Sequence, residues 1–311
     1  MDVVQYTLEP LSPWISPLRS DTLHGLLACQ IAEWEGTAAC KAVLQGFLEN
    51  KPLYTCSSAF PQGFLPMPVL PPMPRALFKK LYTQGARLIT ALQLYKKFKQ
   101  CTFMPYALWQ QHRDALSTRN LFSAYCDNAA AWAVAQTTQS TQAHVSINRN
   151  NQTSLDGGLF FQEVHYEQNP LQIYVQSADQ ERIKLYLTRL GELGFGADST
   201  LGKGRFAVVA SRNVSNDFNH LGKQFLSLSV LSAQNLNELK GTYRTFTKKG
   251  RTWVGKSAIS PFKKPFIALE EGAVLHNISQ NGVLQNIHVD PSIIQLCHAL
   301  ALPCTLASQE A

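Results

Sequence analysis

The sequence predicts an α+β protein built from two modules of ferredoxin-like βαββαβ topology, the second of them degenerate. Patterns typical of a strand, a helix, a hairpin, a second helix, a glycine-rich loop and a strand follow one another over the first two thirds of the chain. The last third is mostly strand-like. The chain has 311 residues, of which 45% are apolar, enough for one large domain or two ordinary ones. We expect an N-terminal domain over residues 1–212 and a C-terminal domain over 213–311.

The N-terminal domain begins with a strand, because apolar and polar residues alternate in VVQYTL. Ser20 can then cap a helix whose apolar positions run at helical spacing to Trp34. Beyond this helix, six prolines lie between Pro61 and Pro74 and exclude a regular helix or a central strand. Helical patterns follow the prolines. We interpret residues 36–142 as a helical and proline-rich insertion.

A long hairpin follows the insertion. HVSINRN and GLFFQEVHYEQ, within residues 144–168, have strand-like composition and are joined by the turn-rich NQTSLDG. We expect this hairpin to form a thumb. LQIYVQS is a further strand, and a helix carrying Ile183, Leu187 and Leu190 leads from it to the glycine-rich loop GFGADSTLGKGRF at 194–206.

The glycine-rich loop is the main candidate for ligand binding. Glycines let the backbone approach a ligand closely, and free N–H groups with flanking cations bind phosphates well. The alternative is a sharp helix-to-strand connection that uses glycine for its positive φ. The candidate phosphate-binding residues are Gly194, Gly196, Ser199, Thr200, Gly202, Lys203, Gly204 and Arg205.

The charge distribution favours a polyanionic partner. Residues 50–113 contain nine Lys/Arg and no Asp/Glu, and residues 201–265 contain twelve Lys/Arg and two Asp/Glu. The whole chain has a formal net charge of only +7, so these two basic blocks stand out from nearly neutral surroundings. Nucleic acid is the simplest partner for such blocks. The alternative is that the lysines are merely solvated.

The cysteines and the N-terminus bear on the compartment. The seven cysteines are scattered, without a C-x-x-C pair, which argues against a disulfide framework or a zinc site and indicates a reducing compartment. MDVVQYTLEP lacks the pattern of a signal peptide. No apolar run approaches the roughly 18 residues of a membrane span. We expect a cytoplasmic protein that neither contacts a membrane nor binds a cofactor.

GRTWVGKS, at Gly250–Ser257, fits the phosphate-loop pattern G-x-x-x-x-G-K-[ST] of nucleotide hydrolases. Such a loop needs a buried strand before it and a long helix after it. The preceding TYRTFTKK is polar and basic, and Pro261 and Pro265 prevent a long helix. We interpret the segment as a basic hairpin tip or a solvated turn. The residues available there to nucleic acid are Lys248, Lys249, Arg251 and Lys256, with Trp253 as a candidate for base stacking.

Several motifs, in order along the chain, resemble one family. The glycine-rich loop is similar to the G-h-G-x-x-x-x-x-G-h-G-h-h signature of the RAMP superfamily, the RNA-binding subunits of CRISPR interference complexes, although Lys203 and Arg205 replace hydrophobic residues. PLRSDTLHGLLACQ and SSAFPQGFLPMP resemble the opening and the proline-rich stretch of one RAMP group. INRNNQTSLDGGLF resembles its hairpin, with Asn148 in place of an aspartate, and KKPFIALEEGAVL its late strand. The resembled group is the subunit of type III-A (Csm) complexes that holds the 5′ handle of the CRISPR RNA.

The resemblance implies a noncatalytic protein of two RRM-like modules. Such a subunit anchors the repeat-derived 5′ handle of the guide RNA, contacts the large polymerase/cyclase-like subunit and caps the first backbone RAMP subunit. The loop from Gly194 to Arg205 and the start of the first helix, with Arg19, Ser20 and His24, would line the RNA path. The hairpin around Arg149 would wedge or kink the RNA strand.

The same residues also permit other functions. A RAMP endoribonuclease could use His24 as general acid–base to cut CRISPR RNA. Metal-dependent cleavage through Asp21 is a further alternative, although a carboxylate there also suits the first turn of a helix. A general interaction protein could dock partners through the segment Pro61–Pro74, but this function would not explain the glycine-rich loop and its cations.

Overall fold

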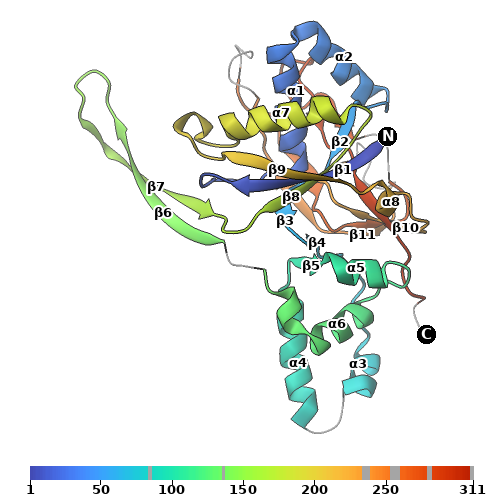
Figure 1. Ribbon diagram of the computed structural model, residues 1–311. Coiled ribbons are helices and arrows are strands. Elements are labelled where there is room, and N and C mark those ends of the chain that lie inside the picture. The colour runs from blue at the N-terminus through green and yellow to red at the C-terminus, as the bar shows by residue number, and fades with distance from the viewer. Residues whose placement is uncertain (83–85, 135–136, 233–238, 253–259, 279–281, 309–311) are drawn as a thin grey trace.

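The computed structural model describes residues 1–82, 86–134, 137–232, 239–252, 260–278 and 282–308. Its centre is a five-stranded antiparallel sheet in the order β2-β8-β1-β9, with β3 also paired to β8. Three helices lie on one face of this sheet (Figure 1). The elements are β1 (Asp2–Pro10), β2 (Tyr54–Cys56), β3 (Phe60–Pro61), β8 (Leu171–Ser177), β9 (Phe206–Asn213), α1 (Ser20–Trp34), α2 (Thr37–Leu48) and α7 (Gln180–Leu193).

Apolar side chains at strand and helix spacing hold these helices to the sheet. Tyr6 and Leu8 of β1 are buried in one core with Ile173 of β8, while Leu23 and Leu27 of α1 pack against them from above. Residues two apart in a strand and four apart in a helix share a face, so these positions form one interior layer. The alternation seen in the sequence is therefore the core-facing side of β1.

The edge of the sheet comes from a part of the chain that the sequence analysis assigned wholly to the insertion. Both β2 and β3 lie within residues 36–142, and β2 pairs with β8 from Tyr54↔Ser177 to Cys56↔Val175. A strand of three buried residues is too short to show alternation. The hairpin does not enter this sheet.

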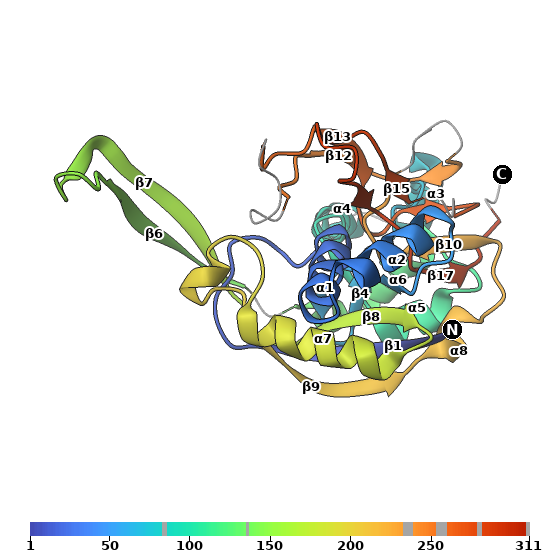
Figure 2. The same cartoon turned by 90° about the horizontal axis from the view of Figure 1, so that it is seen from above.

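The hairpin is a separate two-stranded ribbon made of β6 (Thr138–Ile147) and β7 (Ser154–Tyr166). It projects far from the rest of the molecule, as both Figure 1 and Figure 2 show, and has the form expected of a thumb. Its base is held by a bridge in which the backbone N–H of Trp14 donates to the carbonyl of His165 at 3.0 Å and the reverse bond measures 2.8 Å. We call β6, β7 and their turn the thumb.

A helical lobe, residues 75–132, lies on the side of the sheet opposite to the helices α1, α2 and α7 (Figure 1). Short strands lead into it and an aromatic core fills it. Its elements and their neighbours are β4 (Phe64–Pro66), α3 (Arg75–Tyr82), α4 (Ala86–Phe98), β5 (Phe103–Pro105), α5 (Tyr106–His112), α6 (Thr118–Asp127) and the 3₁₀ helix η1 (Ala129–Trp132).

The C-terminal part consists of short antiparallel strands. A four-stranded sheet has the order β11-β14-β10-β17, and β12-β13 and β15-β16 form two further ribbons. The bounds are α8 (Ser215–Phe218), β10 (Gln224–Ser227), β11 (Gly241–Thr242), β12 (Thr245–Lys248), β13 (Phe266–Leu269), β14 (Val274–Leu275), β15 (Val283–Leu284), β16 (Gln295–Leu296) and β17 (Ala301–Cys304).

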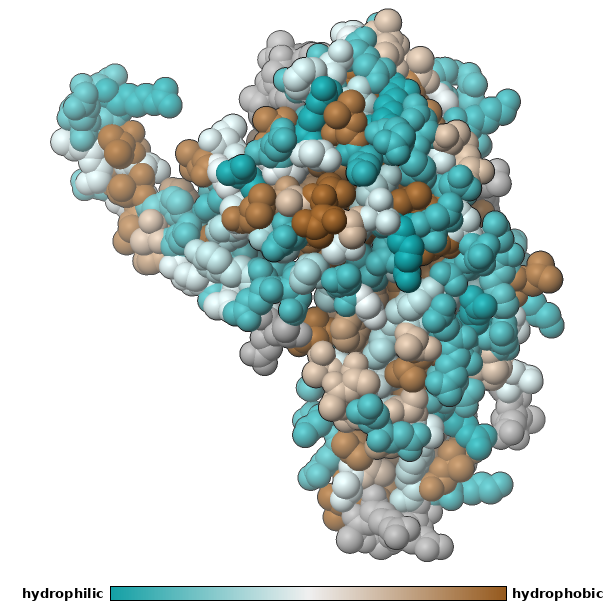
Figure 3. Space-filling view, in the orientation of Figure 1, coloured by the Kyte–Doolittle hydropathy of each residue, from teal (hydrophilic) through white to brown (hydrophobic). Residues whose placement is uncertain are grey.

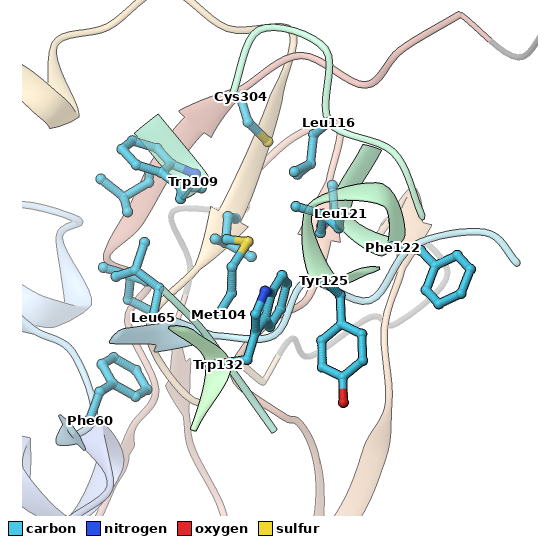
Figure 4. Close-up of a cluster of buried hydrophobic side chains, with 14 of the residues drawn as sticks. Phe60, Leu65, Met104, Trp109, Leu116, Leu121, Phe122, Tyr125, Trp132 and Cys304 are labelled. Carbon is cyan, nitrogen blue, oxygen red and sulfur yellow. The ribbon is translucent and has the colours of Figure 1, made fainter. Parts of the chain in front are cut away.

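One hydrophobic cluster joins the lobe to the C-terminal sheet (Figure 4). Trp109 and Leu121 from the lobe lie around Cys304 of β17, and all three are buried. The backbone N–H of Leu116 also donates to the carbonyl of Thr305 at 2.8 Å. The two parts therefore share a core. None of the helices within the described ranges is long and apolar enough to cross a membrane.

Candidate nucleic-acid interface

The glycine-rich loop leaves α7 and returns to β9 through a closed neck. Gly194 and Gly204 face each other across it, both with positive φ, of 83° and 73°. A Cβ on Gly194 would lie 2.3 Å from the carbonyl oxygen of Lys203, and one on Gly204 would lie 2.2 Å from that of Phe195. No side chain fits at such distances, so the two buried glycines are needed to close the loop.

Most backbone N–H groups in the second half of the loop are used within the chain. Those of Gly202 and Lys203 donate to the carbonyls of Ser199 and Asp198, and that of Gly204 donates to the carbonyl of Pro13. The N–H of Arg205 donates to Oγ of Ser12 at 2.8 Å. The expected cradle of free N–H groups is thus absent from residues 202–205, and a phosphate would meet side chains and the loop tip.

The tip of the loop is open. It contains the 3₁₀ turn η2 (Ser199–Leu201). Gly196, Thr200 and Gly202 are exposed, and a Cβ on Gly202 would meet nothing within 4 Å. The exposed guanidinium of Arg205 donates from Nε to the carbonyl of Glu192 at 3.1 Å, which holds this cation beside the loop.

The sequence predicts that Lys203 is free to bind phosphate, but in the structure its side chain is engaged by other residues of the chain. Its side chain is only 12% exposed. Nζ donates to Oε1 of Gln142, in β6 of the thumb, at 2.9 Å, and lies 3.4 Å from the carboxylate of Asp198. The loop lysine therefore connects the loop to the thumb.

The start of α1 presents one cation and hides two other predicted residues. The Arg19 guanidinium lies 4.5 Å from the ring centroid of Phe246 in β12, its Nε lies 3.9 Å from the Glu271 carboxylate, and the side chain remains 30% exposed. Ser20 is fully buried, where its Oγ accepts from the N–H of Val230 at 2.8 Å. This burial removes the Ser20 side chain from any surface path.

His24 is also fully buried, on the side of α1 that faces β2. Its Nδ1 lies 2.7 Å from the carbonyl of Ser20, and its Nε2 accepts from the N–H of Cys56 at 3.3 Å. Burial, together with the nearby His298, lowers the pKa of His24 to about 3. An imidazole with both ring nitrogens engaged and no exposed surface is not placed to touch RNA or to act on it.

The buried Asp21 carboxylate makes an ion pair with Lys248 of β12, whose side chain is partly exposed. Nζ of Lys248 also lies 3.3 Å from Oγ1 of Thr22, and Nε2 of Gln295 lies 3.5 Å from the Asp21 carboxylate. A lysine ammonium thus occupies the place next to Asp21 that a metal ion would need. The described residues contain no group of three or more His, Cys, Asp or Glu suited to a metal.

The basic segment after β12 keeps two exposed cations. Nζ of Lys249 lies 5.3 Å and the Arg251 guanidinium 5.0 Å from the ring centroid of Phe262. Arg251 and Phe262 form an antiparallel bridge, so residues 249–251 belong to a basic ribbon, while the expected hairpin tip or turn falls outside the described residues. Trp253 and Lys256 lie outside the described residues, as does most of the GRTWVGKS pattern.

The thumb carries a surface that the sequence analysis did not identify. Arg149 is exposed at the tip, as expected. Cross-strand pairs share a face, and the pairs Val145↔Leu159 and Ala143↔Phe161 place three large apolar side chains on one face of the ribbon. These three are 49%, 60% and 66% exposed, and Figure 3 shows hydrophobic side chains gathered along the projecting arm. Their spacing of two residues in VSI and GLFFQ was the available signal.

No protein-family model and no curated protein matches the chain. Solved structures do match. A chain of the Csm1–Csm4 cassette in complex with pppApA is 14% identical, with a TM-score of 0.58, over 99% of this chain and 100% of that one. A chain of the same cassette in complex with AMPPNP is 15% identical, with a TM-score of 0.58, over 98% and 99%.

A chain of the Csm3–Csm4 subcomplex in the type III-A CRISPR–Cas interference complex is 13% identical, with a TM-score of 0.54, over 97% of this chain and 99% of that one. At such identities the likeness establishes the fold. The resemblance that the sequence motifs indicated is therefore confirmed at the level of the fold.

Proposed function

We propose that this chain is the noncatalytic subunit of a type III CRISPR effector complex that anchors the 5′ handle of the crRNA. Csm4 is the component shared by the Csm1–Csm4 and Csm3–Csm4 structures, and nearly complete coverage in both supports a counterpart of one whole component. The motifs quoted from the sequence support the same assignment. The observation that carries it is this full-length likeness combined with a thumb and a closed glycine-rich loop at one end of the sheet.

The fold proposal is two ferredoxin-like modules, over residues 1–212 and 213–311. The order β2-β8-β1-β9, with α1 and α7 on one face, supports the first module. The second is degenerate, since its strands in the described ranges are two to four residues long. Short strands of this kind suit a module that completes its core with the helical lobe.

The proposed RNA path runs over the open loop tip, the exposed cations Arg149, Arg205, Lys249 and Arg251, and the partly exposed Arg19. Phosphates bind cationic side chains and accessible backbone, and apolar or aromatic surfaces support unstacked bases. Arg149 and the apolar thumb face formed by Val145, Leu159 and Phe161 would support the kinked strand. Buried Ser20 and His24, the neck glycines Gly194 and Gly204, and the paired Lys203 and Lys248 are not part of this path. The path residues are Arg19, Arg149, Gly196, Ser199, Thr200, Gly202, Arg205, Lys249 and Arg251.

The proposed partners are the large polymerase/cyclase-like subunit and the first backbone RAMP subunit. Csm1 and Csm3 are the other components of the similar structures. A subunit that holds one end of the guide RNA and touches both neighbours needs two separate protein surfaces. No observation on His24 or Asp21 favours a nuclease, because both side chains are buried and engaged.

The test is to purify the tagged protein from its own host and sequence the RNA that accompanies it. We expect short RNAs with a common repeat-derived 5′ end, together with one large and one backbone-type subunit. The Arg149→Ala, Arg205→Ala double variant should lose most of this RNA, whereas Lys184→Ala, on the exposed side of α7, should retain it. RNA with random ends, or no RNA, would contradict the proposal.

A further inference from the structure

The helical lobe carries the entire formal net charge of the protein. Residues 75–132 contain nine Lys/Arg and two Asp/Glu, a balance of +7, and the whole chain, with 28 against 21, has the same balance. The remainder of the chain is therefore neutral overall, with nineteen residues of each sign. Charge concentrated on one protruding unit produces a local potential that attracts polyanions.

The cations of the lobe stand on a packed scaffold. The ring centroid of Phe122 in α6 lies 4.9 Å from that of Tyr95 and 5.5 Å from that of Phe98, both in α4. Phe78 of α3 lies 5.3 Å from Tyr95. Phe78, Phe98 and Phe122 are buried, so the two helices are fixed against each other and against α6. The helix backbones that carry the charged side chains are thereby fixed before any ligand arrives.

Three lysines in the last turns of these helices are exposed and uncompensated. No ion pair engages Lys80 of α3 or Lys96 and Lys97 of α4 anywhere in the described ranges of the chain. In contrast, Arg113 at the edge of the lobe lies 3.4 Å from the carboxylate of Asp217. The helix macrodipole favours cations in a last turn, but it does not exclude acidic residues from the rest of either helix.

We propose that the helical lobe, through Lys80 of α3 and Lys96 and Lys97 of α4, is a second nucleic-acid contact that binds the phosphate backbone without reading bases. Lysine is depleted in the cores of protein–protein interfaces, whereas it is a common phosphate contact. The lobe lies across the central sheet from α7, which leads into the glycine-rich loop (Figure 1). The lobe contact is therefore additional to the RNA path proposed above.

Ile89 and Leu92 of α4 are also exposed. An acidic protein would contact these apolar side chains together with the lysines, so the test must distinguish a nucleic-acid partner from an acidic protein. The probe is a fluorescein-labelled oligouridylate, titrated with the full-length protein and followed by anisotropy, with polyglutamate as competitor. The lobe variant is Lys80→Gln, Lys96→Gln, Lys97→Gln. The matched control is Lys41→Gln, Lys184→Gln, Lys223→Gln, three exposed lysines outside the lobe with the same loss of charge.

We expect the lobe variant to bind the oligouridylate about tenfold more weakly and to lower the slope of log affinity against log salt by about 2. The matched control should change affinity less than about twofold. An equal loss in both variants would reduce the effect to overall charge and overturn the proposal. Competition by polyglutamate as strong as that by unlabelled RNA would replace nucleic acid with an acidic protein.

A third variant separates the lobe contact from the proposed RNA path. Arg205→Gln alters the glycine-rich loop only, and the lobe substitutions should produce the same fold-loss in that background. If Arg205→Gln has no effect while the lobe variant does, the proposed RNA path fails and the lobe contact stands. If only Arg205→Gln has an effect, the lobe lysines are merely solvated and the inference fails.

Discussion

Nζ of Lys203 donates a hydrogen bond to Oε1 of Gln142 at 2.9 Å, and this bond joins the glycine-rich loop to strand β6 of the thumb. The contact lies above the base of the ribbon, where the Trp14–His165 bridge holds β7. Gln142 is seven residues from Arg149 at the tip, a lever of roughly 20 Å at strand rise. We therefore expect a small change at Lys203 to displace the tip by more than it displaces Gln142.

We expect Lys203→Met and Gln142→Leu to loosen the thumb to the same degree. Amide hydrogen exchange across β6 and β7 should accelerate in each single variant, and the double variant should add little, because both lose one shared contact. Arg205→Met, in the same loop, should leave thumb exchange unchanged. Slow exchange in Lys203→Met, combined with a weaker salt dependence of RNA binding, would instead make Lys203 a phosphate ligand.

The ion pair between buried Asp21 and partly exposed Lys248 should behave as a structural contact between α1 and β12. Lys248→Met leaves a buried carboxylate without its cation, which we expect to lower the free energy of unfolding by about 2–3 kcal/mol, since Lys248 is partly exposed. Asp21→Asn, Lys248→Met together should recover most of that loss. Urea unfolding measures both. A double variant as unstable as Lys248→Met alone would show that Asp21 is not the partner that matters.

Two buried histidines should make stability depend on pH. Burial lowers the pKa of His298 to about 4, and burial with the nearby His298 lowers that of His24 to about 3, from 6.5 in the unfolded chain. At a pH between the folded and the unfolded pKa values, the unfolded chain binds more protons than the folded protein. Stability is therefore complete above about pH 6.5 and falls as the pH drops towards 4, by at least about 2 kcal/mol.

The variant His298→Phe should flatten this pH dependence, and His276→Gln, at an exposed histidine, should not. Thermal unfolding at a series of pH values provides the comparison. An unchanged slope in His298→Phe would mean that other groups cause the acid sensitivity.

The glycines of the loop should differ sharply in their tolerance of alanine. Gly204→Ala places a Cβ 2.2 Å from the Phe195 carbonyl oxygen and should cost about 3 kcal/mol of stability. Gly202→Ala meets open space and should cost only about 1 kcal/mol for its positive φ of 83°. Denaturant midpoints test the order. Equal losses would show that the neck between Gly194 and Gly204 is not as close as described.

RNA binding by the proposed path should be strongly salt-dependent. Each phosphate contact to a single strand contributes about 0.7 to the slope of log affinity against log salt. Arg205→Ala should lower that slope by about this amount and weaken binding at all sequences alike. An affinity independent of salt would exclude the basic surfaces from the interface.

The order of elements, the glycine-rich loop and the thumb could be predicted because each leaves a local pattern. Alternation marks β1 and the hairpin, prolines mark the connection before the lobe, and glycines mark the loop neck. The strand β2 could not be predicted, since Tyr54–Cys56 is short and buried on account of its neighbour β8. The apolar residues of the thumb face alternate with a period of two, but this pattern alone does not tell an exposed face from one that packs in a core.

Local sequence thus accounts for which residue types stand at the candidate site, and for the excess of positive charge on the lobe. Which of those residues reach the surface depends on packing between segments far apart in the chain. Histidine is a residue type that can contact RNA, yet Cys56 and Phe47 enclose His24 in the core. Lys203 and Lys248 have the same charge as Arg205 and Lys249, yet the side chains of Gln142 and Asp21 bind the ammonium groups of the first two. Burial and ion pairing depend on distance in space, and only the folded chain sets that distance.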